Sequence, residues 1–511
     1  MSTAQRVIKN TGFLYAKMGI TMFISLYVTR LVLNALGASD FGIFNVVGGA
    51  IAMLGFLHAA MSSATQRFMS FYEGQGDKEK QKYIFNVSTV LHLGIALLLV
   101  VVLLIAGYFF FNGILNIPPD RVFAAKVIYG ALILSTAFTV LSVPYEAVLN
   151  AHENMLYYSI VGVVESLLKL AVALVIVSYA GDKLVLYGIL MAVIPFIIRT
   201  IMQIYCHKKY EECVIAPKRY FEKGLMKEMT SFAGWSFLSL TSGMVTQYGM
   251  GLVLNNFFGA VLNAAQGVAN QISGQLMVFS NNMLKAVSPV VVKTGGAGDR
   301  VKMLDTSLSS SKFSIYMAAF FMIPFMIEAP YVLKIWLKNI PEWAIVFVRL
   351  QLLRVLLEQF THPLIISIQA QGDIRSFSIY TSLANIVPLF LTWCFFEMGY
   401  PPYFLYVSWI FMWAIVKGGL ILHFAKSKCG LSFSMFNKKV ALPGFFTCVL
   451  MVFTGLLPVF YLETGFLRLV LVGCICWGTF ILLQHFIFLD KSEKKVIKAL
   501  FLAIKQRFVR S

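Results

Sequence analysis

Long runs of apolar residues, separated by short polar connections, fill almost the whole sequence. A helix needs roughly 20 mainly apolar residues to cross the hydrocarbon core of a bilayer, and a longer run tilts or extends into the interface. About fourteen runs meet this requirement. We predict spans at residues 12–37, 41–70, 84–111, 122–148, 157–179, 184–205, 229–255, 261–292, 306–336, 344–368, 377–398, 403–425, 440–461 and 467–489.

The composition supports an all-α polytopic membrane protein. Hydrophobic residues make up 59% of the chain and charged residues 13%, whereas a soluble domain has about 45–50% and about 25%. The first apolar run is long enough to span, so we expect it to be retained as a helix and not removed as a signal peptide.

Basic residues set the orientation. The net charge is +19, but the Lys and Arg residues lie in short connections and at the ends of apolar runs, which argues against nucleic-acid binding. With the N-terminus inside, the inside connections hold about 26 basic residues and the outside ones about four. We therefore predict a bacterial inner-membrane protein with both termini in the cytoplasm. The tail, 490–511, has the pattern of a basic amphipathic helix on anionic lipids.

An internal duplication organises the chain. The segment LVLN occurs at 31–34 and again at 252–255. Glycines recur at nearly the same offset, since Gly37, Gly74 and Gly76 match Gly259, Gly296 and Gly298. The predicted parts are a six-helix lobe (1–205), a cytoplasmic linker (206–228), a second six-helix lobe (229–426), two additional transmembrane helices (427–489) and the tail (490–511).

Six is an even number of spans, so both copies enter the membrane in the same direction. Parallel repeats of this kind surround a midplane site in transporters that alternate between two open states. The duplication therefore favours a transporter.

Three cations inside predicted spans are candidate substrate ligands: Arg30, Arg67 and Lys285. A charge at this depth is costly, so it marks either function or a side chain that reaches back to the interface. Arginine suits phosphate because its planar fork donates two hydrogen bonds at once. Amide side chains at Gln247, Asn255, Gln266 and Asn270 either bind sugar hydroxyls or join helices by hydrogen bonds.

Three acids inside predicted spans are candidate ion-coupling groups: Glu146, Glu165 and Glu328. Glu165 lies four residues before Lys169, a spacing that also favours a local ion pair. The seven histidines and seven cysteines show no metal-ligand spacing. We expect no cofactor, no metal site and no catalytic residue.

Several segments resemble the oligosaccharide flippases of the superfamily that also holds the MATE antiporters. These are TRLVLNALGASDFGIFNVVGGAIAMLGF at 29–56, FEKGLMKEMTSFAGWSFLS at 221–239 and ISIQAQGDIR at 366–375. The resemblance implies two six-helix lobes in a V shape and a cationic cavity. It also implies an undecaprenyl-diphosphate-linked oligosaccharide as substrate. Span 1 lacks the embedded Asp of many MATE antiporters.

The leading hypothesis is a flippase that carries a lipid-linked O-antigen, capsule or exopolysaccharide unit across the inner membrane, with a proton or sodium ion as possible coupling ion. The alternative is a cation-coupled multidrug exporter of the MATE type, which would need an acidic cavity. A membrane polymerase or ligase is disfavoured because every predicted outer connection is about ten residues or fewer, too short for a catalytic loop.

Overall fold

The computed structural model describes residues 3–52, 55–114, 117–337, 340–489 and 493–494. Regular secondary structure within these ranges is entirely helical, which confirms the predicted all-α class. The tail predicted at 490–511 lies outside the described residues except for Glu493 and Lys494.

The chain divides into two compact units, and three helices pass from one unit to the other: α1 (Thr3–Ala52), which changes unit after Ile8, and two later helices. Unit 2 contains residues 9–240 and 292–299, and unit 1 contains residues 1–8, 241–291 and 300–511. Consequently α7 (Lys223–Phe258) changes unit after Leu240, and α8 (Ala260–Gly296) changes unit after Val291.

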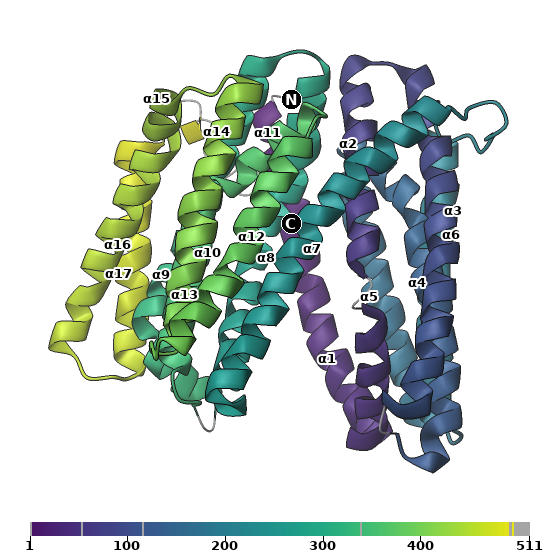
Figure 1. Cartoon of the computed structure of the whole chain (residues 1–511), viewed down its shortest axis with the longest axis horizontal. Coiled ribbons are helices and arrows are strands. Elements are labelled where there is room, and N and C mark those ends of the chain that lie inside the picture. The colour runs from purple at the N-terminus through teal and green to yellow at the C-terminus, as the bar shows by residue number, and fades with distance from the viewer. Residues whose placement is uncertain (1–2, 53–54, 115–116, 338–339, 490–492, 495–511) are drawn as a thin grey trace, which may run out of the picture. The chain divides into compact units, whose positions relative to one another are not determined.

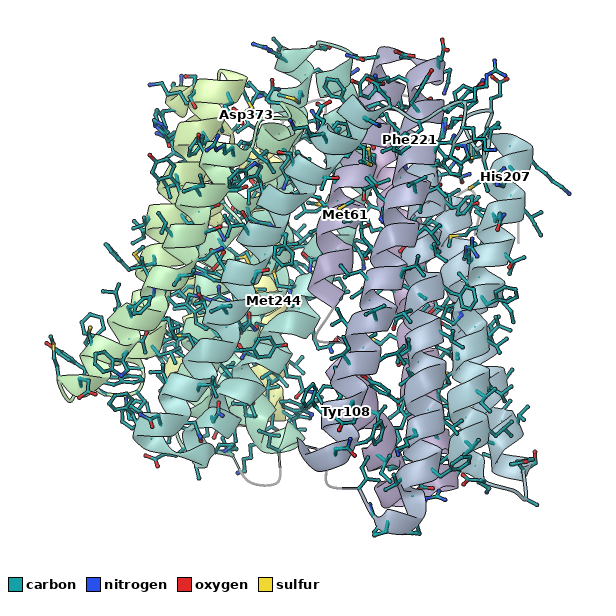
Figure 2. All side chains as sticks on the ribbon, turned by 45° about the vertical axis from the view of Figure 1, so that its right-hand side comes forward. Met61, Tyr108, His207, Phe221, Met244 and Asp373 are labelled. Atoms are coloured by element: carbon teal, nitrogen blue, oxygen red, sulfur yellow. The ribbon has the colours of Figure 1, made fainter. Side chains whose placement is uncertain are left out.

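Unit 2 is a bundle in which α2, α3 and α6 all pack on α4 (Figure 1). Buried Ile128, Ile133 and Leu103 belong to its apolar core. Figure 2 shows Tyr108 towards one end of this bundle and His207 towards the other. The helices of this unit are α1 (Thr3–Ala52), α2 (Gly55–Gln75), α3 (Lys78–Phe109), η1 (Phe110–Ile114), η2 (Pro119–Arg121), α4 (Val122–Ala151), α5 (Met155–Ser178) and α6 (Lys183–Lys209).

Unit 1 has a core built on the fully buried Phe347, Tyr406 and Trp409. The last two long helices, α16 and α17, pack on each other and on α9 (Figure 1). Its further helices are α9 (Arg300–Trp336), α10 (Ala344–Glu358), η3 (His362–Leu364), α11 (Ile365–Ala370), α12 (Arg375–Glu397), α13 (Phe404–Trp409), η4 (Ile410–Val416), α14 (Lys417–Cys429), α15 (Phe433–Phe436), η5 (Asn437–Ala441), α16 (Leu442–Tyr461), α17 (Phe466–Leu483) and η6 (Gln484–Phe488).

Each predicted span falls on a helical segment of the described chain. Ten of the described helices are long and apolar enough to cross a membrane, so the protein is a multi-pass membrane protein. The spans predicted at 41–70, 229–255, 261–292 and 344–368 are helical but are not among those ten. Two of them are α7 and α8, whose amide side chains lower the mean hydropathy, and the last is interrupted between α10 and α11.

Matched glycines of the duplication share a left-handed backbone. Gly37 and Gly259 have φ of 77° and 80°, and Gly76 and Gly298 have φ of 73° and 79°. Glycine adopts this region without the steric cost that a Cβ would impose. The first pair breaks α1 and separates α7 from α8, so the same turn follows the LVLN segment in both copies.

Candidate functional site

The exposed faces of the helices differ in polarity, and this difference locates the candidate site. On α3 the exposed positions Leu97, Val101, Leu104 and Tyr108 are apolar or aromatic, as expected of a surface that faces lipid. On α8 exposed positions include amides. A polar group exposed within a membrane span is favourable only beside water, protein or a polar ligand.

The polar face of α8 forms a regular stripe. Gln271, Gln275 and Asn281 are exposed, and Lys285 follows Asn281 by four residues, on the same side of the helix. Exposed Gly267 and Gly274 lie on this face, and a Cβ added at either would meet no atom within 4 Å. The stripe therefore combines hydrogen-bonding amides, a half-buried lysine and open space.

A second polar face lies on α1. Arg30 and Asn34 are exposed one turn apart. Within the described residues, the Arg30 guanidinium has no ion pair or hydrogen bond. Such a cation can accept an anionic ligand without first breaking a protein contact.

Arg67 has a different environment from Arg30. Its side chain is buried, and its guanidinium carbon lies 4.5 Å, 4.8 Å and 5.5 Å from the ring centroids of Phe68, Phe71 and Phe232. A cation among aromatic faces is held by their quadrupoles. This contact fastens α2 to the first part of α7 within unit 2.

The four predicted amides separate into two groups. Gln247 and Asn255 on α7 are exposed. Gln266 is buried, with its Oε1 facing the α7 backbone at Gly251, and Asn270 Oδ1 accepts a hydrogen bond of 3.2 Å from Gln351 on α10. Asn270 therefore joins α8 to α10, and Gln266 packs against α7, whereas Gln271 and Gln275 on the same helix are exposed.

The embedded acids are mostly neutralised by cations. Lys169 Nζ donates to Glu165 Oε1 at 2.6 Å. Arg468 donates to both oxygens of the fully buried Glu328, from Nε at 2.8 Å and from Nη2 at 3.1 Å. In contrast, the polar contact of half-buried Glu146 is a hydrogen bond of 3.3 Å from Ser142.

Glu146 lies in a charged cluster of unit 2 that includes a residue the sequence analysis missed. Lys17 Nζ is 4.4 Å from the ring centroid of Tyr158. Tyr158 interacts electrostatically with Lys17, Glu146 and Glu165. Lys17 could have been found from the sequence, because it is a cation within the span predicted at 12–37. Arg199 is likewise a cation within the span predicted at 184–205. Arg199 Nε is buried, with no hydrogen-bond partner among the residues described.

Unit 1 has its own buried polar network. Arg354 donates to Glu358, and its guanidinium carbon lies 4.4 Å from the ring centroid of Trp409. Lys417 Nζ donates to Asn385 Oδ1 at 2.9 Å, and Asn385 Nδ2 donates to Ser242 Oγ at 3.0 Å. These contacts tie α10 to α13 and join α7, α12 and α14, and they leave both cations satisfied.

Metal chemistry has no visible basis in the described ranges. They contain no group of three or more His, Cys, Asp or Glu side chains that could hold a metal ion.

Solved structures with similar folds are MATE and related transporters. An outward-facing multidrug resistance MATE family transporter of the MOP superfamily is 15% identical, with a TM-score of 0.72 over 84% of this chain and 96% of that one. A MATE in the bent conformation is 16% identical, with a TM-score of 0.71 over 84% and 99%. A MOP superfamily transporter from Pyrococcus furiosus, described for the reverse polarity of its binding pocket, is 15% identical, with a TM-score of 0.70 over 84% and 98%.

At these identities the likeness establishes the fold alone. No sequence among the curated proteins matches this chain. The polytopic helical fold therefore defines the class as a multi-pass membrane protein with a MATE-like fold.

The match to a protein family assigns the chain more narrowly than its fold does. The pattern of the polysaccharide biosynthesis protein family matches residues 7–294, more than half of the chain. The chain therefore belongs to that family, which confirms the resemblance drawn from the sequence. Family and fold together indicate a transporter or flippase.

Proposed function

We propose that this protein is a flippase for undecaprenyl-diphosphate-linked oligosaccharide in a bacterial inner membrane, with both termini in the cytoplasm. The substrate has a diphosphate, a glycan and a long lipid tail. Each part needs a different surface, and the exposed faces of the helices offer all three.

The observation that carries the proposal is the exposed Arg30, which has no acidic partner among the residues described. Its planar fork matches the oxygens of a diphosphate. The amide stripe of α8, Gln271, Gln275 and Asn281, supplies donors and acceptors suited to sugar hydroxyls. The apolar exposed face of α3 suits contact with lipid.

Arg67 serves a different purpose in this proposal. Its aromatic surroundings give it a positioning role in unit 2, so Arg30 is the phosphate ligand we assign in that unit. Lys285 is the cation we assign to the polar face of α8. Gln247 and Asn255 extend the sugar-binding surface, whereas Gln266 and Asn270 hold α8 in place.

Alternating access between the two lobes of the duplication would carry the substrate across. Glu146 is the coupling acid we assign, for a proton or sodium ion. Unlike Glu165 and Glu328, it has no hydrogen-bonded cation among the described residues to release before it binds one.

The rival function is export of organic cations. The solved structures of similar fold favour it, because several are MATE transporters. A cationic drug would be repelled by an exposed, unpaired arginine in its cavity, so the charge of Arg30 opposes this function.

The test is a gene deletion followed by mass analysis of undecaprenyl-diphosphate lipids and of surface glycan. The flippase function predicts accumulation of one sugar-loaded lipid and loss of surface glycan. Unchanged lipids, with increased sensitivity to cationic dyes, would instead establish the exporter.

Complementation of the deletion strain with variants of Arg30 tests whether this residue binds the diphosphate. Loss of a charge-assisted hydrogen bond costs about 1.5–3 kcal/mol, so Arg30→Ala should weaken substrate binding about 10- to 100-fold. Arg30→Lys should restore part of the transport, since it keeps the charge and loses the fork. Lys126→Ala, which removes another exposed cation of unit 2, is the matched control and should transport normally.

A further inference from the structure

The end of α8 is part of unit 2, although most of this helix belongs to unit 1. Residues 292–299 group with unit 2, and residues 260–291 lie in unit 1. The contacts made by this short segment therefore fix one end of α8 to unit 2. The segment lies at the end of α8 that the basic residues predict to be cytoplasmic.

Two glycines seat the segment on α2. A Cβ added at Gly74 would lie 1.9 Å from the carbonyl oxygen of Lys293. A Cβ added at Gly296 would lie 2.0 Å from the carbonyl oxygen of Phe71. Both obstacles are backbone atoms, so neither position accepts a side chain without a shift of a helix.

The two glycines are equivalent positions of the duplication. Gly74 and Gly296 precede the matched left-handed glycines Gly76 and Gly298 by two residues each. The two helix ends thus meet through the same position of each copy, and the contact is reciprocal.

A lysine holds the seated segment electrostatically. Lys293 Nζ lies 3.3 Å from Glu153 Oε1 and 3.8 Å from Glu73 Oε1. Glu153 is buried and has a φ of 55°, a conformation uncommon for a residue other than glycine. Its backbone follows α4 and turns the carboxylate towards the end of α8.

Neighbouring charges keep Glu73 ionised. Burial raises the pKa of Glu73, but hydrogen bonds from Lys78 and Gln81 and the charges of His152 and Lys293 outweigh it, so its pKa lies below the ordinary value. His152 also contacts the Glu212 carboxylate on its other ring nitrogen. Lys293 therefore faces two carboxylates, Glu73 and Glu153.

We propose that residues 292–299 form a releasable latch, seated by Gly74 and Gly296 and held by Lys293, that opens and closes during transport. The seat itself is a contact between backbone atoms at Gly74 and Gly296, and the last residues of the segment, Ala297 to Asp299, are exposed. Lys293 and Glu73 are partly exposed, so water can replace this ion pair at low cost. Separation of Lys293 from the buried Glu153 costs more, and this contact holds the closed latch.

The latch rests on the proposed function in one respect, because alternating access requires a contact that is made in one state and released in another. The contact itself can be tested without any substrate.

A reversible crosslink tests both halves of the proposal. The variant carries Glu153→Cys and Lys293→Cys, with the exposed native thiols removed by Cys394→Ala and Cys474→Ala. A short, reductively cleavable bifunctional thiol reagent is added to membranes, and the crosslinked peptide is measured by mass spectrometry. The two single-cysteine variants are the controls for unspecific products.

We expect the crosslink to form, transport of the lipid-linked oligosaccharide to stop, and both to reverse on reduction. Absence of the crosslink would disprove the contact. A complete crosslink with unchanged surface glycan would disprove the need for release. Failure of the flippase function itself shows separately, as unchanged lipids in the deletion strain.

A glycine pair tests the seat. Gly74→Ala should lower the crosslink yield at least several-fold, because the added Cβ meets the Lys293 backbone. Gly94→Ala on α3 is the matched control, because a Cβ there meets no atom within 4 Å, and its yield should equal that of the parent. Equal yields for both alanine variants would overturn the role of the glycines.

Discussion

The buried ion pair between Glu328 and Arg468 allows a test of whether an embedded acid takes part in transport or only stabilises the fold. Their side chains are 0% and 8% exposed, and they make two hydrogen bonds to each other. Arg468 also donates to the Leu462 carbonyl oxygen at 3.4 Å. The pair joins α9 to α17, so it holds one of the two additional transmembrane helices against the lobe.

Neutralising one partner leaves the other charge buried and unpaired, which costs about 3–5 kcal/mol. Glu328→Gln and Arg468→Met should each lower the unfolding temperature in detergent markedly. The double variant Glu328→Leu with Arg468→Met removes both charges and should recover most of that loss. Asp305→Asn breaks the exposed pair with Lys439 and should change stability by about 0–1 kcal/mol.

Thermal unfolding of the purified variants checks the structural cost, and surface glycan per unit of membrane protein checks transport. We expect the double variant to transport. If Glu328→Gln left unfolding unchanged and abolished transport, the reasoning would be refuted and Glu328 would be a coupling acid.

The other predictions concern coupling, packing and acid stability. Glu146→Gln should abolish the dependence of transport on an ion gradient, measured in vesicles, whereas Glu165→Gln should keep it. Arg67→Met loses contacts with three rings, each worth about 0.5–2 kcal/mol, and should lower the unfolding temperature while transport per folded molecule stays unchanged. Since the pKa of Glu73 is below its ordinary 4.5 in the folded state, its pairs stabilise the protein above that pH, and the contribution is lost as the pH falls through the lowered value. Glu73→Gln should remove this acid-side loss, which unfolding temperatures between about pH 7 and about pH 3 would check.

Ion pairs between residues close in the sequence were predictable, and ion pairs between residues far apart in the sequence were not. Glu165 and Lys169 lie four apart on one helix, and their ion pair followed from the spacing. Glu328 and Arg468 are 140 residues apart, so nothing in the spacing of either could reveal the pair. For this reason Glu328 remained a candidate coupling acid until packing placed α17 beside α9.

The polar stripe of α8 shows the same limit. Amides occur around much of this helix, so periodicity alone could not choose which ones are exposed. Packing against α7 and α10 buries Gln266 and engages Asn270, and Gln271 and Gln275 remain outside. Lys17 had a sequence signal as a lysine within a predicted span, but its partner Tyr158 lies on a different helix.

The sequence by itself determined the class of the fold, the helical segments and the duplication. A bilayer demands long apolar runs, and the recurring glycines that allow left-handed turns are visible residue by residue. The tertiary structure alone decided which embedded charges are satisfied and which are exposed, because those partners come from helices far apart in the chain. It also revealed that Gly74 and Gly296, matched in sequence, touch each other's helices. Contact between two copies of one motif depends on how the helices pack, and no single stretch of sequence encodes it.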